Sequence, residues 1–153
     1  MGLFSRIFGP KQEAPPETVS LAVQTSEKFA RAIMAHYGQK EFDGDTQAKQ
    51  VLTLYTFGGI SAFAIQNKLS QPQAQAVALT VFTLVFGFPT ADAAAKAQAC
   101  ITAAPDRTSH LYPTIHRGAD GFLHWQKTGD NTAAEDFGDI MAHFKNFDKK
   151  KGA

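Results

Sequence analysis

Cysteine is nearly absent from this sequence, since Cys100 is the only one among 153 residues. A single cysteine cannot form an internal disulfide, and this usage is typical of a reducing compartment, so we expect a cytoplasmic protein. Cys100 lies among alanines in AKAQACITAA with no neighbouring base. The pattern therefore predicts a small, buried, hydrophobic side chain rather than a reactive thiolate.

A strong excess of charge of one sign is also missing. The formal net charge is +1, and only 19% of the residues are charged. A dedicated nucleic-acid binder usually has a strong basic excess, so we expect no nucleic-acid partner. The clustered Lys149, Lys150 and Lys151 are typical of a solvated basic tail, which we place at residues 148–153.

The motifs that identify a reaction are missing as well. The sequence has no phosphate-binding Walker loop, no dinucleotide-binding glycine fingerprint, no His-Glu-x-x-His and no Cys-x-x-Cys. His116 and His124 are eight residues apart, whereas a helical zinc site needs two histidines one turn apart and further ligands. The sequence therefore favours a non-catalytic protein, with no cofactor and no metal.

No hydrophobic run is long enough to cross a membrane. Between residues 50 and 91 the only charged residue is Lys68, and the two apolar stretches there are residues 51–65 and 76–88. Both are shorter than the roughly 20 residues that a spanning helix needs. We therefore predict a charge-poor central helical hairpin and no stable membrane insertion. Gly58 and Gly59 inside it indicate the close approach of another helix or, alternatively, a kink.

The N-terminal sequence MGLFSRIFGP has an apolar start but lacks the long apolar region and cleavage site of a secretory signal. Its apolar side chains would share one face of a short helix that buries too little area for stable membrane anchoring. Weak docking to a membrane or a partner stays an open alternative. The proline-rich GPKQEAPPE comes next, so we assign residues 1–17 to a flexible arm.

Helical periodicity with regular turn signals predicts an all-α fold, a compact bundle of about five or six helices in one domain at residues 18–147. Suitable N-caps are Asp45, Ser70, Thr90 and Thr132, the last at the start of a capping box, TAAE. The segment EFDGD is expected to form a turn. The expected helices are residues 18–37, 46–67, 70–87, 90–103, 112–128 and 132–147.

The stretch TIHRGADGFLHWQ contains two histidines, an arginine, an aspartate and the only tryptophan. Helical spacing separates these residues into two faces. Ile115, Phe122 and Trp125 form an apolar stripe toward the core, and Gly118 permits close packing. The polar edge consists of His116, Arg117, Asp120, His124 and Lys127. Asp120 is three residues from Arg117 and four residues from each histidine, and helix-stabilising pairs at these spacings are enough to explain the polar edge. Contact with a partner is an alternative explanation.

Three further acidic side chains, Glu135, Asp136 and Asp139, fall in the first two turns of the last expected helix. Negative charge at that end stabilises a helix through its dipole. The same side chains also fit an acidic surface for a basic partner.

Two segments, YTFGGISAF and IHRGADGFLHW, resemble small all-α immunity proteins of bacterial polymorphic or type VI toxin systems. The resemblance spans residues 20–145. It implies a cytoplasmic protein that binds and neutralises one cognate protein toxin and has no catalysis of its own. No interface residues carry over from it, and the oligomeric state stays open.

The residues themselves suggest two surfaces for such an interface, the acidic residues of the last helix and the polar edge of residues 116–127. One alternative is a small helical enzyme or ligand-binding domain in which the same polar edge, with a histidine base oriented by Asp120, lines a pocket. A second alternative is a peripheral membrane protein that uses the apolar N-terminus and the charge-poor hairpin.

Overall fold

The computed structural model describes residues 13–152, with side chains for residues 13–146. The described residues form seven α-helices and no strand, so the all-α fold is confirmed and the expected five or six helices were too few. The helices are α2 (Pro16–Tyr37), α3 (Gln39–Asp43), α4 (Thr46–Asn67), α5 (Gln71–Phe86), α6 (Thr90–Ala103), α7 (Tyr112–Thr128) and α8 (Thr132–Gly152).

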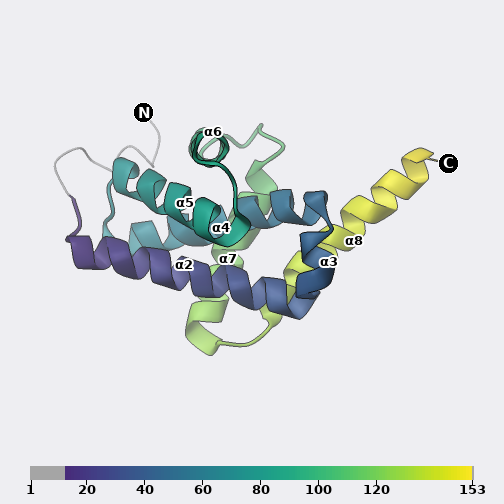
Figure 1. Ribbon diagram of the computed structural model, residues 1–153, viewed down its shortest axis with the longest axis horizontal. Coiled ribbons are helices and arrows are strands. Elements are labelled where there is room, and N and C mark those ends of the chain that lie inside the picture. The colour runs from purple at the N-terminus through teal and green to yellow at the C-terminus, as the bar shows by residue number, and fades with distance from the viewer. Residues whose placement is uncertain (1–12, 153) are drawn as a thin grey trace.

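The central element is α4, which contacts each of the other six helices. Fourteen of its 22 residues are buried, so its low charge reflects burial inside the protein. In Figure 1, α2 and α5 run along the long axis in front of α4, and α7 crosses behind them. The C-terminal turns of α8 extend away from the rest of the molecule. Within the described residues, no helix is long and apolar enough to cross a membrane.

The helix ends follow the capping signals of the sequence in several places. The Asp45 side chain accepts a hydrogen bond from the Ala48 N–H at 3.0 Å, and Ser70 and Gln73 form a reciprocal capping box at the start of α5. Gly87 and Gly129 end α5 and α7 in the left-handed conformation, both with φ of 69°, which glycine adopts without steric cost.

The sequence analysis missed one short helix and misplaced several helix ends. Residues 41–45 were expected as a turn, but residues 41–43 belong to α3, whose Phe42 is buried, 1% exposed. Thr90 and Thr132 are the first residues of α6 and α8 rather than their N-caps. The helix α2 begins at Pro16, a residue that suits a first helical turn. The helix α8 continues past the expected end at residue 147.

The glycines of α4 mark its contact with α7, which confirms the expected close approach of another helix. An added Cβ at Gly58 would overlap the Ile115 carbonyl oxygen and the Ala119 nitrogen. On the facing helix, a Cβ at Gly118 would overlap the Tyr55 carbonyl oxygen. The two backbones therefore touch where both helices lack a side chain.

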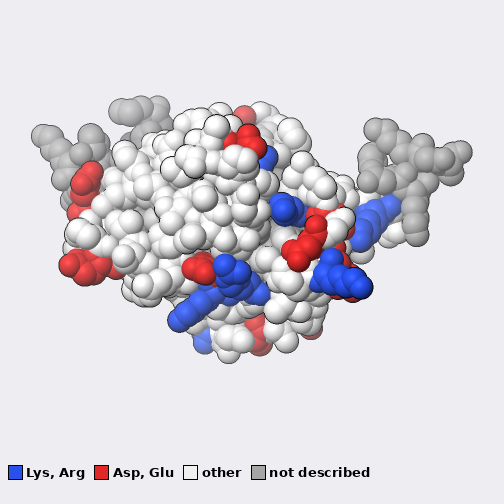
Figure 2. All heavy atoms as spheres, in the orientation of Figure 1, with Lys and Arg blue, Asp and Glu red and all other residues white. Residues whose placement is uncertain are grey.

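The outer face of α5 is uncharged, because this helix contains no Asp, Glu, Lys or Arg. Figure 2 shows a broad white area there, with charged side chains gathered around it. Leu84, 57% exposed, is the most exposed large apolar side chain of the described residues. The apolar N-terminal sequence MGLFSRIFGP falls in residues 1–12, outside the described part.

Candidate functional site

The two surfaces that the sequence offered as separate candidates meet in one groove between α7 and α8. This groove, called the α7–α8 groove below, has a volume of about 330 Å³. Its lining residues come from α4, α7 and α8 and are Tyr55, Arg117, Asp120, Gly121, His124, Thr132, Ala133 and Asp136. Three of the five residues of the predicted polar edge and one of the three predicted acidic residues thus line the same hollow.

Asp136 connects the three helices around the groove. One carboxylate oxygen, Oδ1, accepts a hydrogen bond from the Arg117 guanidinium of α7. The other, Oδ2, accepts a hydrogen bond of 3.0 Å from the Tyr55 hydroxyl of α4. Tyr55 is fully buried, whereas the Arg117 and Asp136 side chains are 48% and 29% exposed. The ion pair therefore lies at the surface and rests on a buried donor.

Two glycines of α7 allow Tyr55 to reach the groove. The Tyr55 backbone lies against Gly118, and an added Cβ at Gly121 would overlap the Tyr55 hydroxyl oxygen. The phenol therefore passes beneath α7 through the space that a side chain at Gly121 would fill. Both glycines fall in the helix expected at residues 112–128, and both leave space that Tyr55 occupies.

The charges of the groove act on one another. Burial and the neighbouring Asp136 carboxylate raise the pKa of Tyr55 above its usual value, so its hydroxyl keeps its proton and remains a donor. The hydrogen bond to Asp136 raises the pKa of Arg117, with a smaller contribution from Asp139. Asp120 is exposed and makes no ion pair or hydrogen bond with another described residue.

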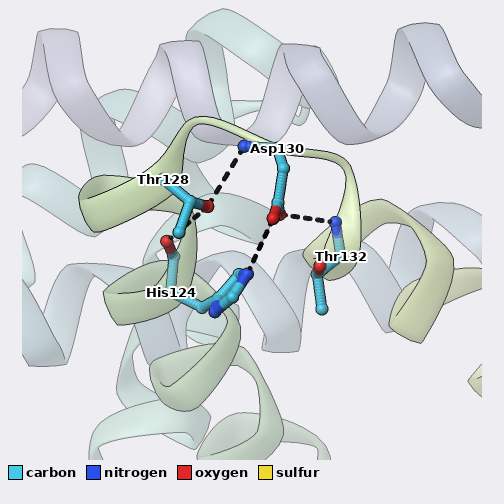
Figure 3. Close-up of polar contacts among 4 residues, drawn as sticks. All are labelled: His124, Thr128, Asp130 and Thr132. Carbon is cyan, nitrogen blue, oxygen red and sulfur yellow. Dashed lines mark hydrogen bonds and ion pairs between the residues drawn. The ribbon is translucent and has the colours of Figure 1, made fainter.

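His124 lines the groove and also contacts the loop between α7 and α8 (Figure 3). Its Nε2 lies 3.0 Å from Asp130 Oδ2, and because a carboxylate only accepts, Nε2 donates. Asp130 Oδ1 also accepts the Thr132 N–H at 3.0 Å, which caps the start of α8. Hydrogen bonds to Thr132 and His124 lower the pKa of Asp130 to about 2.

His116 does not belong to this groove. Its Nε2 donates to the Ala104 carbonyl oxygen at 2.9 Å, and its ring stacks on Tyr112 at 3.8 Å between centroids. The histidine therefore fastens the start of α7 to the end of α6. The expected pairs of Asp120 with neighbours on its own helix do not form, because those neighbours bond to other elements instead: Arg117 to α8, His124 to the α7–α8 loop and His116 to Ala104.

The remaining acidic residues, Glu135 and Asp139, are exposed on α8 outside the groove lining. Ile115 and Phe122 are buried, and Trp125 is half-buried against Phe29 at 5.3 Å between ring centroids. The apolar stripe predicted for α7 is thereby confirmed.

A larger open hollow of about 720 Å³ lies at the junction of α2, α3, α4 and α8. Three of its polar side chains already bond to one another: Lys145 Nζ lies 3.1 Å from the Tyr37 hydroxyl and 3.4 Å from Asp45 Oδ2. The Tyr37 hydroxyl also bonds to Asp45 at 3.1 Å. These contacts brace α8 against the start of α4, so we place the candidate site in the smaller groove.

The α7–α8 groove offers both hydrogen-bond acceptors and hydrogen-bond donors. It presents carboxylate oxygens, a guanidinium and a buried phenol donor; Arg117 and Asp120 are exposed, and Asp136 is half-buried. In the described part of the chain, no three His, Cys, Asp or Glu side chains converge as metal ligands do. Cys100 is buried, and burial raises the pKa of its thiol to about 12, which leaves it protonated at neutral pH.

Sequence reasoning missed two residues of this region, Tyr55 and Asp130. Tyr55 stands in a buried run of α4, and nothing in its neighbourhood indicates that its hydroxyl reaches the surface. The signal for it was the Gly118 and Gly121 pair on the other helix. Asp130, just after the Gly129 that ends α7, stands where a side chain often caps the following helix.

Comparison with known proteins gives a family for this chain. No curated protein and no solved structure matches it significantly. Residues 18–145 match the sequence profile of the family described as immunity protein 48. The match covers every element around the groove, from α4 through α8, and nearly all of the described helices. The chain therefore belongs to the immunity protein 48 family.

Proposed function

We propose that this protein neutralises one cognate bacterial toxin by direct protein–protein contact in the cytoplasm, without catalysis of its own. The observation that carries the proposal is the match of residues 18–145 to an immunity protein family. The exposed, mixed-charge groove and the protonated, buried thiol support it, because they suit recognition better than covalent chemistry.

The proposed interface is the surface around the α7–α8 groove. It comprises Arg117, Asp120 and His124 of α7 with Glu135, Asp136 and Asp139 of α8. His116 takes part only as the residue that fixes the start of α7, because its ring nitrogen is bound to Ala104. The exposed carboxylates outnumber the cations, so the surface would attract a basic face of the toxin and steer its approach.

The test is co-expression with the product of the adjacent gene. That product alone should arrest growth, and this protein should restore growth and purify with it as a stable complex. A neighbouring product that is not toxic, or a toxin that neither binds this protein nor loses its effect in its presence, overturns the proposal.

Variants of the surface then test the interface. Asp120→Lys and Asp139→Lys change exposed side chains that make no contact required by the fold, so they should weaken the complex while thermal stability stays the same. Glu17→Lys, in the first turn of α2, makes the same change of charge away from the groove and serves as the control. Equal effects at all three positions would refute this location.

A further inference from the structure

The α7–α8 groove already binds a guanidinium, namely that of its own Arg117. Asp136 receives this group on one carboxylate oxygen while Tyr55 occupies the other. The Tyr55 hydroxyl is buried and keeps its proton, so it fixes the orientation of the carboxylate beneath the groove. A carboxylate has about four positions for accepted hydrogen bonds. Two are used here, and Asp136 therefore has further capacity on its exposed side.

The groove contains a second carboxylate that nothing in the described structure neutralises. Asp120 lies in the turn of α7 after Arg117, is exposed and has no charged partner among the described residues. With Arg117, Asp120 and Asp136 counted at full charge, the charged lining has a net charge of −1. The open hollow of about 330 Å³ between these groups has room beside Arg117.

We propose that the α7–α8 groove is a receptor for one arginine side chain of a protein partner, held by Asp120 and Asp136. The inference rests on the proposed function insofar as the partner is the toxin. Arginine fits better than lysine because the planar guanidinium has five N–H donors spread over a fixed fork, whereas the ammonium is a compact point charge with three. Arg117 then acts as an internal competitor, and it gives up part of its contact with Asp136 when the partner arginine enters.

The probe is N-acetyl-arginine amide, titrated into the ¹⁵N-labelled full-length protein at constant ionic strength and followed through the backbone amides of Gly121 and Ala133. These amides should shift saturably. N-acetyl-citrulline amide, which has the same shape without the charge, should produce no such shift. No saturable shift with the arginine probe, or equal shifts with both compounds, overturns the proposal.

Three variants identify the contacts. Asp120→Asn should weaken binding of the probe by about two- to fivefold, the range of one exposed ion pair. Arg117→Gln should strengthen it by a similar factor because the competing guanidinium is gone. Lys127→Gln removes the same charge from the same helix outside the groove and should have little effect. If Lys127→Gln and Arg117→Gln act equally, general attraction explains the binding and the receptor is refuted.

This titration contains no toxin, so its outcome is separate from that of the co-expression experiment. If the protein neutralises its toxin but does not bind the arginine probe, the proposed function is supported and the arginine receptor is refuted. If the protein binds the probe but protects against no toxin, the arginine receptor is supported and the proposed function is refuted.

Discussion

The glycine contact between α4 and α7 makes a quantitative prediction about stability. Gly58→Ala adds one methyl group at a point where its position is already taken by the Ile115 carbonyl oxygen and the Ala119 nitrogen. Neither is the end of a flexible side chain, so rotation of a neighbour cannot relieve the overlap. The two helices must separate until a normal carbon–oxygen contact of about 3.3 Å is restored.

The change in the free energy of unfolding is the penalty of this overpacking minus the gain from replacing glycine within a helix. Overpacking a well-packed interior costs about 1–3 kcal/mol, and we take the upper end, about 3 kcal/mol, because backbone moves against backbone. Alanine in place of glycine within a helix returns about 1 kcal/mol of backbone entropy. The net loss is therefore about 2 kcal/mol. For a chain of this length the midpoint of thermal unfolding should fall by roughly 4–8 °C.

Gly138→Ala is the matched control. Gly138 also lies inside a helix, α8, but an added Cβ there meets no atom within 4 Å. Only the gain in helix propensity remains, so this variant should unfold at a temperature about 2–4 °C higher than the unchanged protein.

The assay is urea and thermal unfolding followed by circular dichroism, with both variants measured in parallel. Gly118→Ala should behave like Gly58→Ala, because its Cβ would overlap the Tyr55 carbonyl oxygen across the same contact. If Gly58→Ala is as stable as Gly138→Ala, the backbones of α4 and α7 do not touch and the reasoning fails.

Three further predictions concern single side chains. Tyr55→Phe leaves the ring in place but removes its hydrogen bond to Asp136; because that carboxylate is partly exposed, we expect a loss near 1.5 kcal/mol in urea unfolding, and an unchanged midpoint would contradict the bond. Asp130 has a pKa of about 2 in the fold and 3.8 as its ordinary value, so it contributes stability that is present above pH 4 and lost as the pH falls toward 2; Asp130→Asn should flatten this part of a plot of melting temperature against pH, and parallel curves would refute its role. Cys100, buried with a pKa raised to about 12, should react with a thiol reagent at neutral pH only after unfolding, and rapid labelling of the folded protein would show that it is accessible.

Sequence reasoning succeeded where the signal was local. Asp45 as a cap, Gly129 as a helix end and the apolar stripe of α7 each depend on residues within two turns of one another. The short helix α3 was missed because its formation depends on burying Phe42 in the core, and burial is a tertiary effect that a five-residue pattern does not reveal.

The candidate site was predicted in composition but not in assembly. The sequence placed Arg117 and Asp136 on different helices, and the packing of α8 against α7 and α4 brings them together. From the sequence, Arg117 could also pair with Asp120, because the two residues are three positions apart on the same helix. A side-chain pair at this spacing stabilises a helix by only about 0.2–0.5 kcal/mol, so a contact between two helices easily replaces it.

The position of Tyr55 joins the stability of the fold to the shape of the groove. Its backbone lies in the contact of α4 with α7, and its hydroxyl holds the carboxylate of Asp136. A substitution at Tyr55 or Gly121 would therefore change both properties, and a loss of toxin neutralisation there would not by itself identify an interface. Exposed Asp120 lacks this ambiguity, because no hydrogen bond or ion pair within the described structure depends on it. Binding defects at Asp120 with unchanged unfolding are consequently the evidence that would separate recognition from folding.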